Sequence, residues 1–266
     1  MAINLSDFLS ARQDVRLQAE LARLPSFPEH LQHFLVTGPE RSGKTSILFH
    51  FAHSKAAGGN KVVFICKRAK LEQVPPLLPH GGDVKDPAYS NVQMRYLDTM
   101  AELRRYAACF HLLEAPPSAL VVDDISDFLD SRILDRRMRE ADLVKTLALL
   151  HNAVTSVRRK GGAAGHTCVL LVSDTSPADS PHAVYLFKRW LPLTFAIKRA
   201  PCLRTAARQA GDLEFALLPA AAEAHALAPG CLSQLHFSLA SHSALVLTSV
   251  TASHQPGPPS DALAFL

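Results

Sequence analysis

A glycine-rich turn between an apolar run and a helical pattern constrains the fold of this chain more than any other feature. Residues 33–51, HFLVTGPERSGKTSILFHF, contain the pattern G-x-x-x-x-G-K-[ST] from Gly38 to Thr45. The context is the one that a phosphate-binding loop requires, because a short apolar strand is expected before the loop and a helix after it. Backbone N–H groups of such a loop and the helix N-terminus bind phosphate anions. The sequence therefore predicts a nucleotide site at this turn.

The residues of this loop have distinct expected roles. Lys44 is expected to contact the β- and γ-phosphates, and the hydroxyl of Thr45 to bind Mg²⁺, which makes both candidate catalytic residues. The predicted cofactors are ATP and Mg²⁺. The residues expected to surround the nucleotide are Gly38, Pro39, Glu40, Arg41, Ser42, Gly43, Lys44, Thr45 and Ser46.

A metal-bound nucleotide needs a second anchor, and residues 118–124, SALVVDD, contain a candidate. The apolar residues predict a buried strand that carries Asp123 to its carboxyl end, where Mg²⁺ would lie. Asp123 is therefore the predicted second metal ligand and the third catalytic candidate. Asp124 lies one step further, on the other side of the strand, and either competes for this role or caps the helix that follows.

Strands that alternate with helices predict the fold class. Continuously apolar strands call for a parallel sheet that is covered on both faces. Short β-like segments after Pro192 predict antiparallel strands at one edge. The predicted fold is therefore α/β, with a mainly parallel central sheet, helices on both faces and an antiparallel β-rich C-terminal edge.

The length of 266 residues suits one large domain with appendages. Ser6 as an N-cap and leucines at helical spacing predict one amphipathic helix within residues 1–25. Residues 26–250 are assigned to the nucleotide-binding core. The Pro/Ser-rich segment 251–266 is predicted to be a mobile tail, and residues 71–90, rich in proline with a glycine pair, an irregular loop.

Composition narrows the class of protein. Lys and Arg outnumber Asp and Glu by only 28 to 24, so net charge does not by itself indicate a polyanion binder. The five cysteines form no CxxC pair and the thirteen histidines no HxxxH or HxH pair, which predicts a reducing compartment, cytosol or nucleus, without disulfides or structural zinc. The N-terminus lacks the apolar core of a secretory signal and no run approaches transmembrane length, so no membrane partner is expected.

A basic segment with interleaved aromatic residues predicts contact with single-stranded DNA. Residues 185–209 contain six Lys or Arg and no Asp or Glu, together with Tyr185, Phe187 and Trp190. Cations neutralise the nucleic-acid backbone and aromatic faces stack on bases. The alternative is a solvated basic face with Trp190 in the core. The candidate DNA-binding residues are Lys188, Arg189, Lys198, Arg199 and Arg204.

Over residues 33–200 the chain resembles the RecA-fold strand-exchange recombinases and their eukaryotic paralogues. The motifs that carry the resemblance are, in order, GPERSGKT, VVFI, ALVVDD and CVLLVSD. Within this family the chain is most similar to the small ATPase that partners the SWIM-type zinc-finger protein in the Shu complex, on the segments KRAK, VPPLLP and EAPPSALVVDD.

This resemblance implies a RecA-like core and a role in homologous recombination, where the protein would assist recombinase assembly on single-stranded DNA. The implied partners are a SWIM-type zinc-finger protein, a recombinase or recombinase paralogues, and single-stranded DNA. The implied location is the nucleus.

Two departures from the family imply slow hydrolysis. The second strand of active recombinases ends in an acidic segment whose glutamate activates water, whereas Arg68 stands about there in this chain and cannot accept a proton. The sensor strand ends in Ser173-Asp174 instead of a polar pair with glutamine. We therefore expect a weak ATPase. The alternative is a nucleotide-stabilised protein-interaction scaffold without significant turnover.

Residues 8–11, FLSA, resemble the Phe-x-x-Ala segment through which recombinase subunits dock onto their neighbours. The alternative is that Phe8 and Leu9 make the core contacts of an amphipathic helix. The two interpretations differ in whether Phe8 is buried within its own chain.

Overall fold

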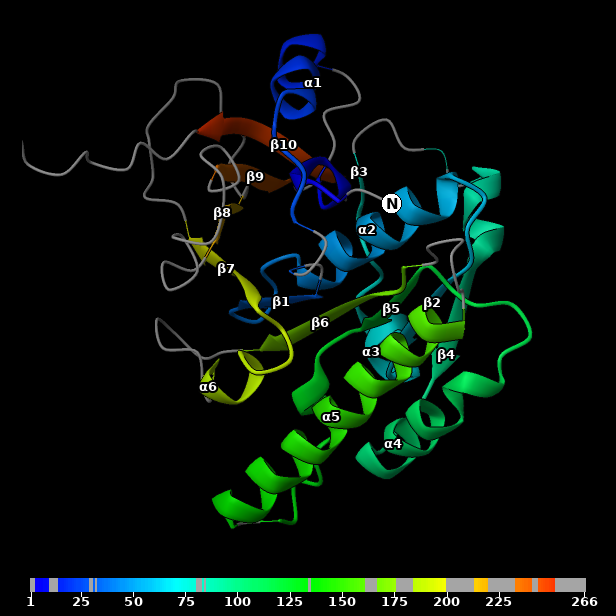
Figure 1. The fold of residues 1–266 in the computed structure, drawn as a ribbon. Coiled ribbons are helices and arrows are strands. Elements are labelled where there is room, and N and C mark those ends of the chain that lie inside the picture. The colour runs from blue at the N-terminus through cyan, green and yellow to red at the C-terminus, as the bar shows by residue number, and fades with distance from the viewer. Residues whose placement is uncertain are drawn as a thin grey trace, which may run out of the picture.

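The computed structural model is organised around one sheet, whose strand order is β3-β10-β9-β8-β7-β1-β6-β5-β2-β4 (Figure 1). It describes residues 3–9, 14–28, 31, 33–79, 83, 85–133, 135–160, 167–175, 184–199, 213–219, 233–240 and 244–251. The strands are β1 (His33–Gly38), β2 (Val62–Cys66), β3 (Leu78–Pro79), β4 (Val92–Tyr96), β5 (Ala119–Val122), β6 (Val169–Thr175), β7 (Leu193–Arg199), β8 (Leu213–Pro219), β9 (Gln234–Ala240) and β10 (Ala244–Thr251).

The strand directions confirm the predicted fold class. Strands β4, β2, β5, β6, β1 and β7 pair in parallel. Strands β8, β9 and β10 continue the sheet from β7 in antiparallel pairs, and the short β3 joins the far side of β10. The result is a mostly parallel α/β sheet with an antiparallel C-terminal edge, consistent with a RecA-like core.

Helices cover both faces of this sheet. In Figure 1, α2 lies on one side of the central strands and α4 and α5 lie on the other. The α-helices are α1 (Val15–Ala22), α2 (Lys44–Ala57), α3 (Arg68–Gln73), α4 (Met100–Cys109), α5 (Arg136–Lys160) and α6 (Val184–Phe187). The short 3₁₀ helices are η1 (Leu5–Asp7), η3 (Pro87–Asn91), η4 (Phe110–Leu112) and η5 (Ile125–Phe128).

The central strands are apolar throughout because each supplies side chains to two cores. In β1, Phe34 and Val36 belong to the cluster under α2, whereas Leu35 belongs to the cluster under α4 and α5. Successive strand residues point to opposite faces, so a strand between two helical layers must be apolar at every position. No helix in the described part of the chain is long and apolar enough to cross a membrane.

The N-terminal segment differs from the single helix expected from the sequence. The structure has the 3₁₀ turn η1 and a separate helix α1, and residues 10–13 between them lie outside the described ranges. Asn4, not Ser6, caps the first turn, and the Asp7 side chain accepts a hydrogen bond from the Asn4 backbone. The division of the chain into helix, core and tail stays a prediction, and residues 252–266 of the tail are not among those described.

The described residues of the segment from 71 to 90, which are 71–79, 83 and 85–90, include regular elements. It contains the end of α3, the two-residue strand β3 and most of η3. Within it, the backbone N–H of Leu77 donates to the hydroxyl of Ser46 on α2, at 2.9 Å. Prolines interrupt long elements but leave room for short ones that are held by tertiary contacts.

Phe8 lies in the core of its own chain. Its ring is fully buried, and its centroid lies 5.0 Å from that of Phe51, 5.2 Å from that of Phe195 and 5.4 Å from that of Phe34. The preceding Asp7 forms a buried ion pair with Lys55 of α2, at 2.6 Å. These contacts favour the core interpretation of Phe8 over that of a docking segment.

Replacing Phe8 by Ala should lower the free energy of unfolding by about 3–5 kcal/mol, because the ring leaves a cavity among three aromatic neighbours. Urea denaturation measures this change. Val15→Ala is the control, since the Val15 side chain is 82% exposed, and it should change the free energy by about 0.5 kcal/mol or less. Equal effects of the two substitutions would contradict the burial of Phe8.

Candidate nucleotide site at the carboxyl edge of the sheet

The loop between β1 and α2 has the backbone path that phosphate binding requires. Gly43 has φ 81° and Arg41 has φ 56°, so left-handed residues alternate with others and turn successive N–H groups toward one side. Gly38 is needed for a different reason, because a Cβ there would lie 2.8 Å from the Cβ of Ile197 on β7. The two glycines of the motif are therefore each required by a separate contact or conformation.

Lys44 lies folded back across this loop. Its ammonium donates to the carbonyl oxygens of Gly38, at 3.0 Å, and Pro39, at 2.7 Å. Burial lowers the pKa of Lys44, and this effect outweighs the nearby carboxylates, which favour the charged form. The ammonium is thus held at the mouth of the loop by acceptors that a phosphate oxygen can replace.

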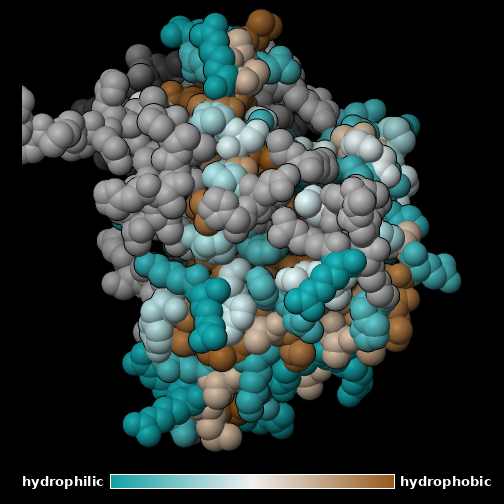
Figure 2. Space-filling view, viewed as in Figure 1, coloured by the Kyte–Doolittle hydropathy of each residue, from teal (hydrophilic) through white to brown (hydrophobic). Residues whose placement is uncertain are grey.

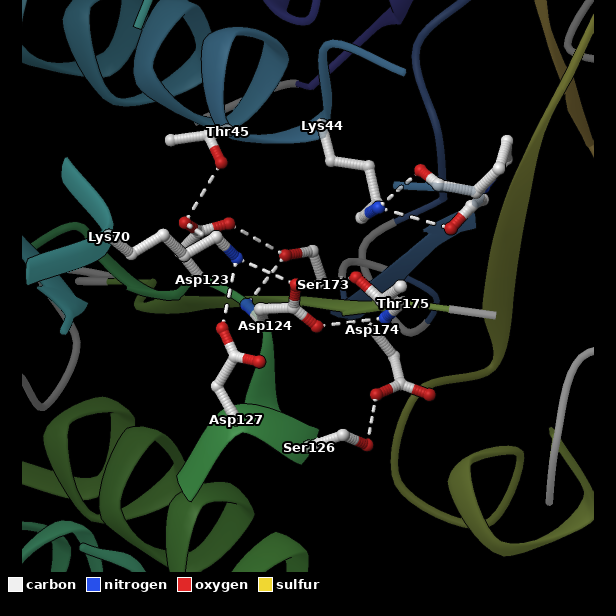
Figure 3. A network of polar contacts seen from close by, with 12 residues as sticks. Lys44, Thr45, Lys70, Asp123, Asp124, Ser126, Asp127, Ser173, Asp174 and Thr175 are labelled. Atoms are coloured by element: carbon white, nitrogen blue, oxygen red, sulfur yellow. Dashed lines mark hydrogen bonds and ion pairs between the residues drawn. The ribbon is translucent and has the colours of Figure 1, made fainter. Parts of the chain in front are cut away.

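Thr45 and Asp123 are in direct contact. The Thr45 hydroxyl donates to Oδ2 of Asp123 at 2.9 Å, and the Ser173 hydroxyl donates to Oδ1 of the same carboxylate at 2.9 Å (Figure 3). Asp123 is 1% exposed, and burial raises its pKa even though Lys70 opposes that change. The carboxyl ends of β1, β5 and β6 therefore bring Lys44, Thr45 and Asp123 to one edge.

Asp124 is not a helix cap of the kind considered from the sequence. It adopts φ 55°, and its side chain makes no capping bond to η5. Its carboxylate instead accepts from the ammonium of Lys70, at 2.6 Å, and from the backbone N–H of Thr175, at 2.8 Å. Burial alone would raise the pKa of Asp124, but Lys70 and the hydrogen bonds outweigh it and hold this pKa below its usual value.

Lys70 is the site residue that sequence reasoning missed. Its ammonium lies 2.6 Å from Asp124, 3.2 Å from Asp127 and 3.6 Å from Asp123, and Figure 3 shows it pointing into this cluster. These carboxylates raise the pKa of Lys70 against the opposing effect of burial. The basic segment KRAK contains Lys70, but the comparison of the sequence with active recombinases singles out Arg68 in the same segment.

Arg68, the residue singled out instead, points elsewhere. Its side chain is 63% exposed, its guanidinium lies 4.3 Å from the ring centroid of Tyr96, and it is 3.7 Å from Glu72. Helix α3 begins at Arg68, and residues two apart on a helix are rotated by about 200°. Lys70 and Arg68 therefore face opposite sides.

These residues fit a magnesium nucleotide. The hydroxyl oxygen of Ser42 is buried without a hydrogen-bond partner among the described residues, at the start of α2. The donor set of a lysine, a threonine hydroxyl and one carboxylate is the one that Mg²⁺ and phosphates use together. Within the described ranges, no group of three or more His, Cys, Asp or Glu could hold a metal without such phosphates.

The basic residues predicted to bind DNA fall into two pairs. Lys188 and Arg189 follow α6 and are exposed, and Arg189 lies 5.7 Å from the ring centroid of the half-buried Trp190. Lys198 and Arg199 are exposed at the end of β7. Lys188 and Arg189 precede β7 in the chain, whereas Lys198 and Arg199 are its last two residues. Arg204 lies outside the described residues.

The visible face in Figure 2 has a mixed surface outside the grey region. Hydrophilic side chains dominate over α4 and α5, with apolar patches between them. Exposed apolar residues in the described ranges include Leu112, Met138 and Tyr185.

Asp174 is expected to make the stability of the fold depend on pH. Its carboxylate is 4% exposed and accepts a hydrogen bond from Ser126, and burial raises its pKa to about 6. Because the unfolded pKa is lower, at about 3.9, the folded state binds the proton more tightly and loses stability as pH rises from about 4 to 6. Asp174→Asn should remove this loss and raise the free energy of unfolding at pH 7.5 by up to about 3 kcal/mol.

Urea denaturation at pH 4.5 and pH 7.5 tests this expectation. The free energies of unfolding of the wild type and Asp174→Asn should differ less at pH 4.5 than at pH 7.5. Glu114→Gln, at an exposed carboxylate, is the control and should leave the pH dependence unchanged. If Asp174→Asn is less stable than the wild type at pH 7.5, the expectation that ionised Asp174 destabilises the folded state is contradicted.

Comparison with known proteins shows which proteins this chain is similar to. No protein-family model matches this chain. The chain is 30% identical over 161 residues to a mouse (Mus musculus) protein named ATPase SWSAP1. The match covers 59% of this chain and 55% of the relative, so the chain spans about half the length of the curated relative that it matches. This similarity supports the resemblance to the RecA-like recombinase paralogues that the motifs indicate.

Proposed function

We propose that this protein binds ATP with Mg²⁺ and serves as a recombinase-paralogue subunit in repair by homologous recombination. One observation carries the nucleotide part: Lys44 and Thr45 of the loop converge with the buried Asp123 at the carboxyl edge of the sheet. The role in recombination is supported by the RecA-like topology and by the similarity to the protein named ATPase SWSAP1.

The chain's own residues have clear tasks in this proposal. The backbone N–H groups at the start of α2 bind phosphate oxygens, and Lys44 exchanges its two carbonyl acceptors for the terminal phosphates. Bound Mg²⁺ neutralises phosphate charge. Thr45 and Asp123 would hold the metal that the nucleotide brings, and Ser173 keeps the Asp123 carboxylate oriented.

Hydrolysis is proposed to be slow, because the carboxylates near the site have other partners. Asp124 is bound to Lys70 and Thr175, and Asp174 accepts from Ser126. The first two residues after β2, Lys67 and Arg68, are basic, so neither can accept the proton of an attacking water. The same arrangement favours the second candidate function, a nucleotide-stabilised scaffold for protein partners without significant turnover.

The proposed partners are a SWIM-type zinc-finger protein, a recombinase or its paralogues, and single-stranded DNA, in the nucleus. Direct contact with DNA is proposed for Lys188, Arg189, Lys198 and Arg199, which are exposed, and for Arg204. One cationic pair precedes β7 and the other ends it, and several exposed cations are suited to contacts with successive phosphates of single-stranded DNA.

Lys44→Ala should weaken ATP binding at least about tenfold, equivalent to about 1.4 kcal/mol, because the charge at the terminal phosphates is lost. Titration of a fluorescent ATP analogue in the presence of Mg²⁺ measures the affinity. Lys61→Ala, at an exposed lysine before β2, is the matched control and should bind like the wild type. Equal affinity in all three proteins would rule out this nucleotide site.

Phosphate release by the same wild-type preparation separates the two candidate functions. A weak ATPase should turn over below about 1 s⁻¹, compared with roughly 1–100 s⁻¹ for kinases, and should lose this activity in Lys44→Ala. A scaffold should show the same background release in both proteins.

Replacing Lys188, Arg189, Lys198 and Arg199 together by Ala should flatten the salt dependence of single-stranded DNA binding. Each lost phosphate contact removes about 0.7 from the slope of log affinity against log salt. Fluorescence anisotropy over a salt series measures this slope. The matched control replaces four exposed cations elsewhere, Lys61, Lys85, Arg105 and Arg139. The same slope in both quadruple variants would support the solvated-face interpretation.

A further inference from the structure

In the function proposed above the ammonium of Lys70 only occupies Asp124, yet it lies among three carboxylates of the site. It contacts the three carboxylates of Asp123, Asp124 and Asp127 within 3.6 Å. Its side chain is 29% exposed, whereas that of Asp123 is fully buried and that of Asp124 is 6% exposed. Lys70 is therefore a partly exposed cation that pairs with two buried carboxylates.

The Lys70 ammonium lies close to the place where a metal ion would bind. Oδ2 of Asp123 is the oxygen that accepts from the Thr45 hydroxyl, and the same Oδ2 lies 3.6 Å from the Lys70 ammonium. Thr45 and Asp123 are the two side chains that would hold Mg²⁺. The ammonium thus lies beside the oxygen that a metal would share with Thr45.

Charge decides what this arrangement does. When Asp123, Asp124 and Asp127 are all ionised they carry three negative charges, which without Lys70 would repel a nucleotide triphosphate unless a divalent cation were bound. The positive charge of Lys70 offsets one of these three negative charges. Lys70 lies on a short helix that starts two residues after β2, so the position of its charge is fixed by the fold.

We infer that Lys70 is a resident counter-cation of the nucleotide site, which excludes free Mg²⁺ from Asp123 and lets ATP bind with little dependence on Mg²⁺. This inference rests on the proposed nucleotide binding. It makes Lys70 a positioning residue, which acts through Asp123 and Asp124. A purely structural ion pair would stabilise the fold in the same way but would leave the metal dependence of nucleotide binding unchanged.

The first test uses Mg²⁺ alone, without nucleotide, and follows thermal unfolding. The wild type should gain about 1 °C or less from 10 mM MgCl₂, because Lys70 occupies the site. Lys70→Met should gain several degrees, since a metal can replace the missing charge and a ligand of the folded state raises its stability. Lys67→Met removes a lysine three residues away that has no recorded contact with the cluster, and it should respond like the wild type.

The second test compares the affinity for a fluorescent ATP analogue in MgCl₂ and in EDTA. The wild type and Lys67→Met should lose less than about fivefold in EDTA, and Lys70→Met about fiftyfold or more, a difference of at least one order of magnitude. Lys70→Arg keeps the charge and should behave like the wild type. This variant and the wild type decide the question even if Lys70→Met does not fold.

The outcomes separate this inference from the function on which it rests. A wild type that binds no nucleotide in MgCl₂ would overturn both. A wild type that binds in MgCl₂ but loses fiftyfold in EDTA would overturn the inference alone. So would a wild type that is stabilised by Mg²⁺ alone as strongly as Lys70→Met.

Discussion

The carboxyl edge of this sheet is organised by the need to compensate two adjacent buried carboxylates. Asp123 and Asp124 follow a fully apolar strand and are almost inaccessible to solvent. A buried charge is costly unless it is paired and hydrogen-bonded, so each carboxylate requires partners from neighbouring elements. Thr45 comes from α2, Lys70 from α3, and Ser173 and Thr175 from β6. The need to pair the two carboxylates that follow β5 therefore determines how α2, α3 and β6 are arranged around them.

The same network links stability to function. The phosphate loop is connected to Asp123 through Thr45, and α3 is connected to it through Lys70. A ligand that changes the charge at Asp123 must therefore change the balance on Lys70 and Asp124 as well. A nucleotide bound there would therefore act on α2, α3 and β5 at once.

The N-terminal segment depends in a related way on α2, the helix that follows the glycine-rich loop. Phe8 packs against Phe51 of α2, while Asp7 pairs with Lys55 and accepts from Ser54 of the same helix. The segment is therefore part of the face that carries α2, although it lies outside the phosphate-binding motif in sequence. Burial of Phe8 within its own chain explains why a short Phe-x-x-Ala pattern is poor evidence of a docking segment.

The sequence by itself determined the α/β class, the phosphate loop and the buried aspartate, because these depend on local spacing: glycines in a turn, apolar runs in strands, and an acid directly after a strand. Only the tertiary structure decided that Lys70 rather than Arg68 enters the site and that Asp124 pairs with it. Lys70 and Asp124 are 54 positions apart in the chain, and the direction of each side chain depends on where α3 begins and how it packs. The break in the N-terminal helix has the same origin, because the burial of Phe8 among distant aromatic residues overrides the local helical pattern.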